Sequence, residues 1–239
     1  MKPISKKIKK INPSPTLSIT AKAKKMQSDG IDVISFGAGE PDFDTPQNIK
    51  DAAKNALDKG FTKYTPTAGI AELKKLICAK FEKDNKLKYS QDEILVSCGA
   101  KHSIFNAIMT LVDEGDEVIL PSPYWVSYPE MINFAGGKVV IIKTSKETNF
   151  KITPQQLKDV ISEKTKLFIL NSPSNPTGMV YSEQELKQIA DILVENNIYC
   201  ISDEIYEKII YDDTKHISIA SFNEKIKQLT IVVNGVLED

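Results

Sequence analysis

The sequence contains no arginine: all 31 basic residues are lysines. Arginine carries the planar fork that binds carboxylates and phosphates through two parallel hydrogen bonds. Any anion site in this chain must therefore use lysine, backbone N–H groups or hydroxyls. The formal net charge of −1 gives no electrostatic attraction towards nucleic acid or a membrane surface. We therefore expect partners of neither kind.

Cysteine and histidine are also scarce. The three cysteines are far apart and form no C-x-x-C pair, which excludes a disulfide framework and a zinc site. Two histidines are too few for most metal centres, so no metal is expected. No apolar run is long enough to cross a bilayer, and no apolar segment of a signal peptide follows the basic N-terminus. A cytoplasmic protein with reduced thiols is the expectation.

Strand and helix patterns alternate along most of the chain. Short apolar, β-branched runs predict strands at residues 93–97, 117–121, 138–143, 166–171, 198–202 and 229–233. Helical spacing of apolar residues is found at 46–59, 69–84, 100–112, 154–162, 183–196 and 218–227. This alternation is typical of an α/β fold with a mostly parallel sheet flanked by helices on both faces.

The N-terminal part has a different character. Residues 1–45 are polar and rich in proline, with one helical stretch near 19–29 and a short strand pattern at 33–36. A length of 239 residues allows one large domain with a small appendage. We predict a boundary that separates an N-terminal segment, 1–45, from a main domain, 46–239.

Ligands of parallel α/β sheets bind beyond the carboxyl ends of the strands. After the strand pattern at 93–97, Gly99, Ala100 and Lys101 open a helix. Free N–H groups and the positive end of the helix dipole suit a phosphate there, and the lysine adds a charge. A simple tight turn would explain the same residues.

Aromatic and amide side chains follow the next strand patterns. Trp125, the only tryptophan, comes after 117–121 and can stack on a flat ring, although it can equally close the rim of the core. Asn175 lies in the proline-rich loop 171–178, and the proline that follows holds it extended with its amide directed outward.

An aspartate ends the strand pattern at 198–202. Asp203 at the end of a buried apolar strand is costly unless a cation or several donors meet it, and Tyr206 can face the same ligand. Capping of the next turn is the alternative role for this aspartate. Together, the strand ends describe a ligand with a phosphate, a flat ring, a polar substituent and a protonated ring nitrogen. Pyridoxal 5′-phosphate (PLP) has these features.

Six sequence motifs carry a family resemblance. They are FGAGEPDFDTP (36–46), KYTPTAGI (63–70), CGAKHSIFN (98–106), PSPYWVSYPEM (121–131), NSPSNPTG (171–178) and SDEIYE (202–207). In this order and spacing, the chain resembles class I aminotransferases of PLP fold type I, and among them the bacterial aspartate aminotransferases, from about residue 3 to residue 236. The resemblance implies that 46–239 is an incomplete PLP-binding large domain and that 1–45 is an arm with a small-domain segment.

The resemblance implies a role for each matching residue. The cofactor-binding residues would be Gly99, Ala100 and Lys101 at the phosphate, Trp125 on the ring, Asn175 and Tyr206 at the 3′-oxygen, Asp203 at the ring nitrogen, and Tyr64 at the phosphate of the other subunit's cofactor. The substrate-binding residues would be Gly39 and Asn175 at the carboxylate, Trp125, and Lys101 with Thr16 at the distal carboxylate of an acidic substrate. The site of a complete enzyme would thus be shared across a homodimer.

One position departs from the family. The family continues after Asn234-Gly235 to a lysine that carries the Schiff base, and its position here, 238, is a glutamate. We therefore assign no catalytic residue and expect this chain alone not to transaminate. The family's C-terminal part, with its anion-binding arginines, is not in this sequence.

The resemblance implies an aminotransferase that moves an amino group between an amino acid, with L-aspartate favoured, and a 2-oxo acid. This chain would be its N-terminal portion. Two alternatives stay open: a non-catalytic fragment that binds PLP, and another fold type I enzyme such as a C–S lyase, whose cofactor residues are the same.

Overall fold

The computed structural model describes residues 2–37, 39 and 43–236. Four residues of the 36–46 motif and position 238 lie outside this range. The described residues form two compact units, one within 13–70 and a larger one made of 2–12 with 71–236. This division follows compactness, whereas the predicted boundary at 45/46 follows sequence composition and the family resemblance, and it stays a prediction.

The described residues of 13–70 contain two helices, α1 (Pro15–Ser28) and α2 (Gln47–Asp58). Helix α1 begins where the sequence provides a cap, since the Ser14 hydroxyl accepts the N–H of Leu17 and proline occupies the first turn. The strand predicted at 33–36 is wrong, because these residues pair with no strand of the described chain.

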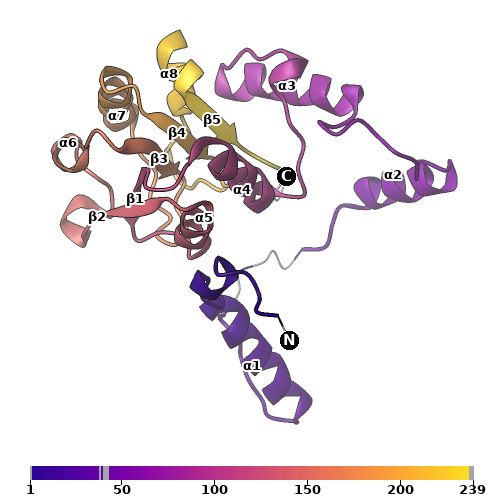
Figure 1. Ribbon diagram of the computed structural model, residues 1–239. Helices are drawn as coiled ribbons and strands as arrows, with labels where there is room; N and C mark the ends of the chain where they lie inside the picture. Colours follow the sequence, from indigo (N-terminus) through magenta and orange to yellow (C-terminus); the bar gives the residue numbers. More distant parts are fainter. Residues whose placement is uncertain (1, 38, 40–42, 237–239) are drawn as a thin grey trace. The chain divides into compact units, whose positions relative to one another are not determined.

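The larger unit is built on a parallel sheet (Figure 1). Its strands are β1 (Glu117–Ser122), β2 (Lys138–Lys143), β3 (Thr165–Asn171), β4 (Tyr199–Asp203) and β5 (Thr230–Val233). Their order is β2-β1-β3-β4-β5, and every neighbouring pair is parallel. The predicted fold class is therefore confirmed.

Helices cover both faces of this sheet. Helices α4 (Ala100–Leu111) and α5 (Ser127–Ala135) cover one face, and α6 (Pro154–Val160), α7 (Glu183–Glu195) and α8 (Glu224–Leu229) cover the other. Helix α3 (Ala71–Asn85) belongs to a separate, smaller apolar cluster. Short 3-10 turns lie at Ile8–Lys10, Gln91–Glu93, Lys146–Thr148 and Ile219–Ser221. None of the helices in the described part of the chain has the length and apolar character needed to cross a membrane.

Successive residues of the central strands pack into two hydrophobic cores, one on each face of the sheet. Leu167 of β3 packs with α4 and α5 on one face, while Phe168 packs with α6, α7 and α8 on the other. Ile201 and Cys200 of β4 divide in the same way. Because side chains alternate along a strand, two covered faces require apolar residues at consecutive positions. This explains the uninterrupted apolar runs in the sequence.

Two other expectations about elements need correction, and the structure adds one helix that the sequence patterns do not predict. The run 93–97 is not a strand, because it pairs with no strand of the described chain, although Ile94 is still buried beside Phe81 and Leu87. A single helix at 218–227 is replaced by a 3-10 turn and α8, which Asn223 caps. Helix α5 was not predicted.

Candidate functional site

The candidate site lies in the larger unit, where the carboxyl ends of β1, β3 and β4 meet the start of α4. Asp203, the last residue of β4, is only 4% exposed. Its Oδ2 accepts a 2.6 Å hydrogen bond from the Tyr128 hydroxyl, and Oδ1 accepts the N–H of Ile205 at 3.3 Å. Burial raises the pKa of Asp203, these two hydrogen bonds oppose the rise, and the Glu204 charge adds to it. A cation at this position would relieve the cost of the buried charge.

The loop after β3 places an amide beside the Tyr206 hydroxyl. Asn175 Nδ2 donates to the Tyr206 hydroxyl at 3.4 Å, so the structure brings these two predicted residues together. Asn171 fixes the loop, since its Oδ1 accepts the N–H of Asn175 at 2.7 Å and its Nδ2 donates to the Asp203 carbonyl at 3.0 Å. Two polar tips therefore lie side by side at the ends of β3 and β4.

The start of α4 brings a lysine to the aromatic side of the site. Gly99 precedes the helix with a φ of 88°, a conformation that favours glycine, and Ala100 is the first helical residue. Lys101 Nζ lies 5.0 Å from the ring centroid of Trp125. The indole in turn meets the ring of Tyr128 edge-on, with 5.3 Å between centroids and 85° between planes.

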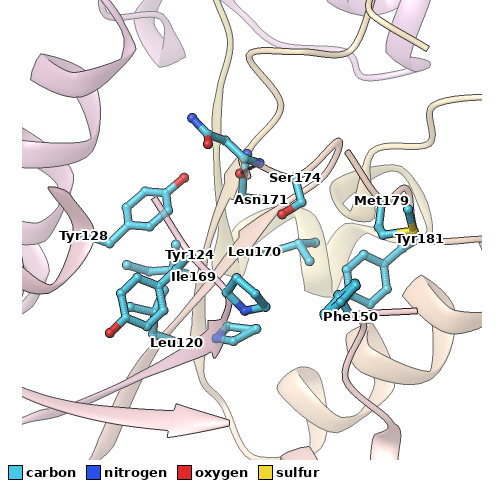
Figure 2. A pocket seen from close by; sticks show the side chains of 13 residues that line it. Leu120, Tyr124, Tyr128, Phe150, Ile169, Leu170, Asn171, Ser174, Met179 and Tyr181 are labelled. Carbon is cyan, nitrogen blue, oxygen red and sulfur yellow. Dashed lines mark hydrogen bonds between the residues drawn. The ribbon is translucent and has the colours of Figure 1, made fainter. Parts of the chain in front are cut away.

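A small cavity of about 20 Å³ lies between the ends of β1 and β3 (Figure 2). Tyr128 and Asn171 line one side of it, and Phe150, Met179 and Tyr181 line the other. This volume is close to that of a single water molecule. The cavity is thus too small for a substrate, and Asn175 is among the residues that line it.

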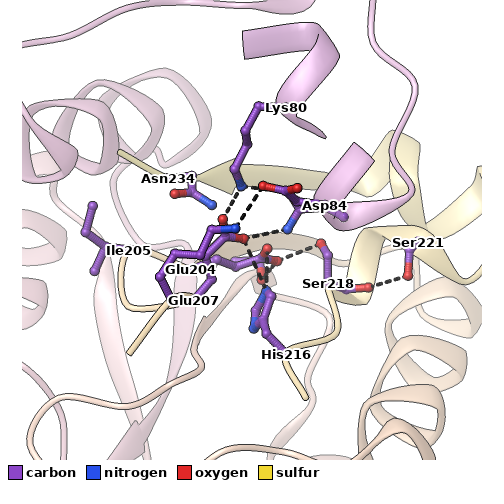
Figure 3. A network of polar contacts seen from close by, with 12 residues as sticks. Lys80, Asp84, Glu204, Ile205, Glu207, His216, Ser218, Ser221 and Asn234 are labelled. Atoms are coloured by element: carbon purple, nitrogen blue, oxygen red, sulfur yellow. Dashed lines mark hydrogen bonds and ion pairs between the residues drawn. The ribbon is translucent and has the colours of Figure 1, made fainter. Parts of the chain in front are cut away.

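A second group of buried carboxylates, Glu204 and Glu207, follows Asp203 in the sequence and belongs to a polar network (Figure 3). Glu204 is 1% exposed and accepts hydrogen bonds from the hydroxyls of Ser202 at 2.8 Å and Ser218 at 2.7 Å. His216 Nε2 lies 2.9 Å from its other oxygen. Successive side chains along a strand point to opposite faces of the sheet, so Glu204 points away from the face on which Asp203 meets Tyr128.

Glu207 completes this network. It pairs with the ammonium group of Lys80 from α3 and accepts the side-chain amide of Asn85 at 2.6 Å. Burial would raise the pKa of Glu207, but the hydrogen bonds from Lys80 and Asn85 and the nearby positive charge lower it.

The Glu204, Glu207 and His216 side chains are close enough to share a metal ion. Their carboxylate oxygens, however, already accept hydrogen bonds from protein donors. This arrangement is typical of a structural network, and its effect is to fix the segment that carries Asp203 and Tyr206.

Sequence reasoning missed Tyr128 and this network. Tyr128 lies in the quoted motif 121–131, three residues after Trp125, so helical spacing could have placed it near the indole. The pairing of Lys80 with Glu207 spans 127 residues and leaves no local signal.

Three predicted residues belong to the unit 13–70. Thr16 lies in the first turn of α1, and its carbonyl accepts the Thr20 hydroxyl at 2.9 Å. Tyr64 is fully exposed, and no heavy atom lies within 4 Å of a Cβ built on Gly39. Their contacts with substrate or with a second subunit stay predictions.

Residues 31–236 match a protein family described as aminotransferase class I and II. This match spans most of the chain, which therefore belongs to that family.

Among its relatives is the aspartate aminotransferase of Bacillus sp. (strain YM-2), 55% identical over 233 residues, which cover 98% of this chain and 59% of that protein. A probable aspartate/prephenate aminotransferase of Aquifex aeolicus (strain VF5) is 52% identical over 98% of this chain and 59% of its own length. The solved aspartate aminotransferase from Thermus thermophilus with maleate has a TM-score of 0.96 and 42% identity, over 100% of this chain and 61% of that one. The chain thus spans about 59% of the length of the curated relatives it matches.

Proposed function

We propose that this chain forms the cofactor-holding part of a PLP-dependent aminotransferase that acts on an acidic amino acid, with L-aspartate favoured, and a 2-oxo acid. The observation that carries the proposal is Asp203, a buried carboxylate with a raised pKa at the end of a central strand. The names of the relatives support the reaction class.

The donor set fits this cofactor. Asp203 would pair with the protonated ring nitrogen, and Trp125 would stack on the ring. Tyr206 and Asn175, whose polar tips already meet at 3.4 Å, would contact the 3′-oxygen. Gly99, Ala100 and Lys101 would hold the phosphate at the start of α4. Because the sequence has no arginine, lysine, backbone N–H groups and uncharged side-chain donors such as hydroxyls and amides must provide its anion recognition.

When bound, PLP supplies an electron sink for the transfer of an amino group. Asp203 would keep the ring nitrogen protonated, because a buried carboxylate without a cation is more costly than one that is paired. The aromatic side chains around Trp125 would exclude water from one face of the ring, and Lys101 and Thr16 would attract the distal carboxylate of the substrate.

The step that moves a proton at the substrate requires a base of its own. The position that the family resemblance assigns to the Schiff-base lysine is 238, a glutamate that lies outside the described residues. We therefore assign no catalytic residue in this chain and expect no turnover from it alone. Tyr64 would serve the other subunit of a homodimer.

Titration of the full chain with PLP tests the proposal. Trp125 is the only tryptophan, so its fluorescence should be quenched as the ring stacks on it. Asp203→Asn should weaken binding about 100-fold, since it removes one partner of a buried charge pair. Asp213→Asn, at an exposed position, is the matched control and should bind as the wild type does. Equal affinities of all three proteins would contradict the proposal.

A further inference from the structure

Tyr128 connects the two sides of the candidate site. It comes from α5, is 1% exposed and donates through its hydroxyl to Asp203 Oδ2 at 2.6 Å. Its ring meets the edge of Trp125, with centroids 5.3 Å apart. Asp203 ends β4, whereas Trp125 lies after β1. The Tyr128 side chain therefore contacts both the residue proposed for the cofactor's ring nitrogen and the residue proposed for the face of that ring.

The hydroxyl of Tyr128 is a donor over the physiological pH range. Burial raises the pKa of Tyr128 well above its ordinary value, and the Asp203 carboxylate adds to the rise. A phenol that keeps its proton beside a carboxylate makes a charge-assisted hydrogen bond, the stronger kind of protein hydrogen bond.

We propose that Tyr128 is a positioning residue: its hydroxyl holds the Asp203 carboxylate in place for a cationic ring nitrogen, and its ring supports Trp125. The inference rests on the proposed function, because it assigns to Asp203 the role of partner to that nitrogen. Tyr128 itself touches neither the substrate nor the reacting atoms in this assignment.

The surroundings of Asp203 make the hydroxyl important. Ile205 provides the other hydrogen bond, through its backbone N–H at 3.3 Å, which is long. The negative charge of Glu204, the next residue in the chain, disfavours the charged form of Asp203. The phenol of Tyr206 is a further polar neighbour of Tyr128. Without the Tyr128 hydroxyl, Asp203 would keep one long hydrogen bond, and its carboxyl group would gain rotational freedom and affinity for a proton.

The first test uses the chain without ligand. Tyr128→Phe removes the hydroxyl and keeps the ring, and a carbon-13 NMR titration follows the Asp203 carboxyl, which is assigned by its disappearance in Asp203→Asn. The pKa of Asp203 should rise by about one unit in Tyr128→Phe. Tyr181→Phe, in which another buried tyrosine loses its hydroxyl, is the control and should leave it unchanged. No shift in Tyr128→Phe would overturn the inference.

The second test uses two ligands. One is PLP, and the other is its benzene analogue, in which a CH group replaces the ring nitrogen. Tyr128→Phe should weaken PLP binding roughly tenfold and binding of the analogue less than twofold, because only PLP uses Asp203. An equal loss for both ligands would assign Tyr128 a merely structural role and overturn the inference.

The two proposals fail in different ways. Lack of PLP binding by the wild-type chain would contradict the proposed function and, with it, the role of Tyr128 towards the ligand. Normal PLP binding by the wild type, with an unshifted Asp203 pKa in Tyr128→Phe, would leave the proposed function intact and remove only this inference.

Discussion

Asp203 and Glu207 are two buried carboxylates four positions apart, and their surroundings differ. Glu207 has an ammonium group from Lys80 and an amide from Asn85, and its pKa is lowered. Asp203 has a phenol and one long backbone hydrogen bond, and its pKa is raised. Within the described residues, no lysine or histidine forms an ion pair with Asp203.

The difference separates a structural carboxylate from one available to a ligand. A charge that is fully paired within the protein stabilises the fold and has little left to offer a ligand. A charge that is buried and only partly satisfied destabilises the ligand-free chain, and a cation that binds there recovers that cost. Three measurements of stability test this comparison.

Lys80→Met should have the largest effect, because it leaves Glu207 buried without its cation. We expect a loss of about 2 kcal/mol at pH 7, which is below the range for fully buried pairs because the Lys80 side chain is 31% exposed. The lowered pKa of Glu207 contributes stability that is present above its unfolded pKa and is lost as pH falls through the folded pKa. The difference between variant and wild type should therefore shrink in acid. Urea unfolding at several pH values measures it, and a constant difference would contradict the assignment.

Asp203→Asn should have a smaller effect, with the opposite pH dependence. The raised pKa of Asp203 means that the folded wild type loses stability as pH rises from the unfolded pKa through the folded one. The asparagine variant has no such loss. Its stability relative to the wild type should therefore grow as pH rises over this range. Thermal unfolding without PLP measures the trend, and a difference that falls with pH would show that Asp203 is already paired.

Lys187→Met should have the smallest effect. Lys187 pairs with Asp191 one turn along α7, and both side chains are about half exposed, at 47% and 57%. Exposed pairs of this spacing contribute about 0.3–0.5 kcal/mol. The variant is also the control for Lys80→Met, since both replace a paired helical lysine. A loss as large as that of Lys80→Met would mean that burial does not distinguish the two pairs.

The sequence predicted the sheet better than its surroundings. Five of the six strand patterns in the main domain coincide with strands, because central parallel strands are apolar at every position. The run 93–97 has the same composition but pairs with no described strand, and β structure requires a partner. Helix α5 was missed because Val126 provides no side-chain cap and Pro129 falls within it.

The candidate site was predictable only where residues follow strands. Asp203, Asn175 and Tyr206 could be named because each comes just after an apolar run. The hydrogen bond between Tyr128 and Asp203 joins residues 75 positions apart, and it depends on how α5 packs against the sheet. Such a contact has no periodicity that a single sequence could reveal.

The alternation at the end of β4 has a consequence for protein engineering. Ser202 and Glu204 face one side of the sheet and Asp203 faces the other. Substitutions at adjacent positions should therefore affect either the stability of the fold or the binding of the ring. A library at Ser202, Ser218 and His216 would vary thermal tolerance, while a library around Asp203 would vary affinity for the ring. The two searches can be run in parallel and their best variants combined.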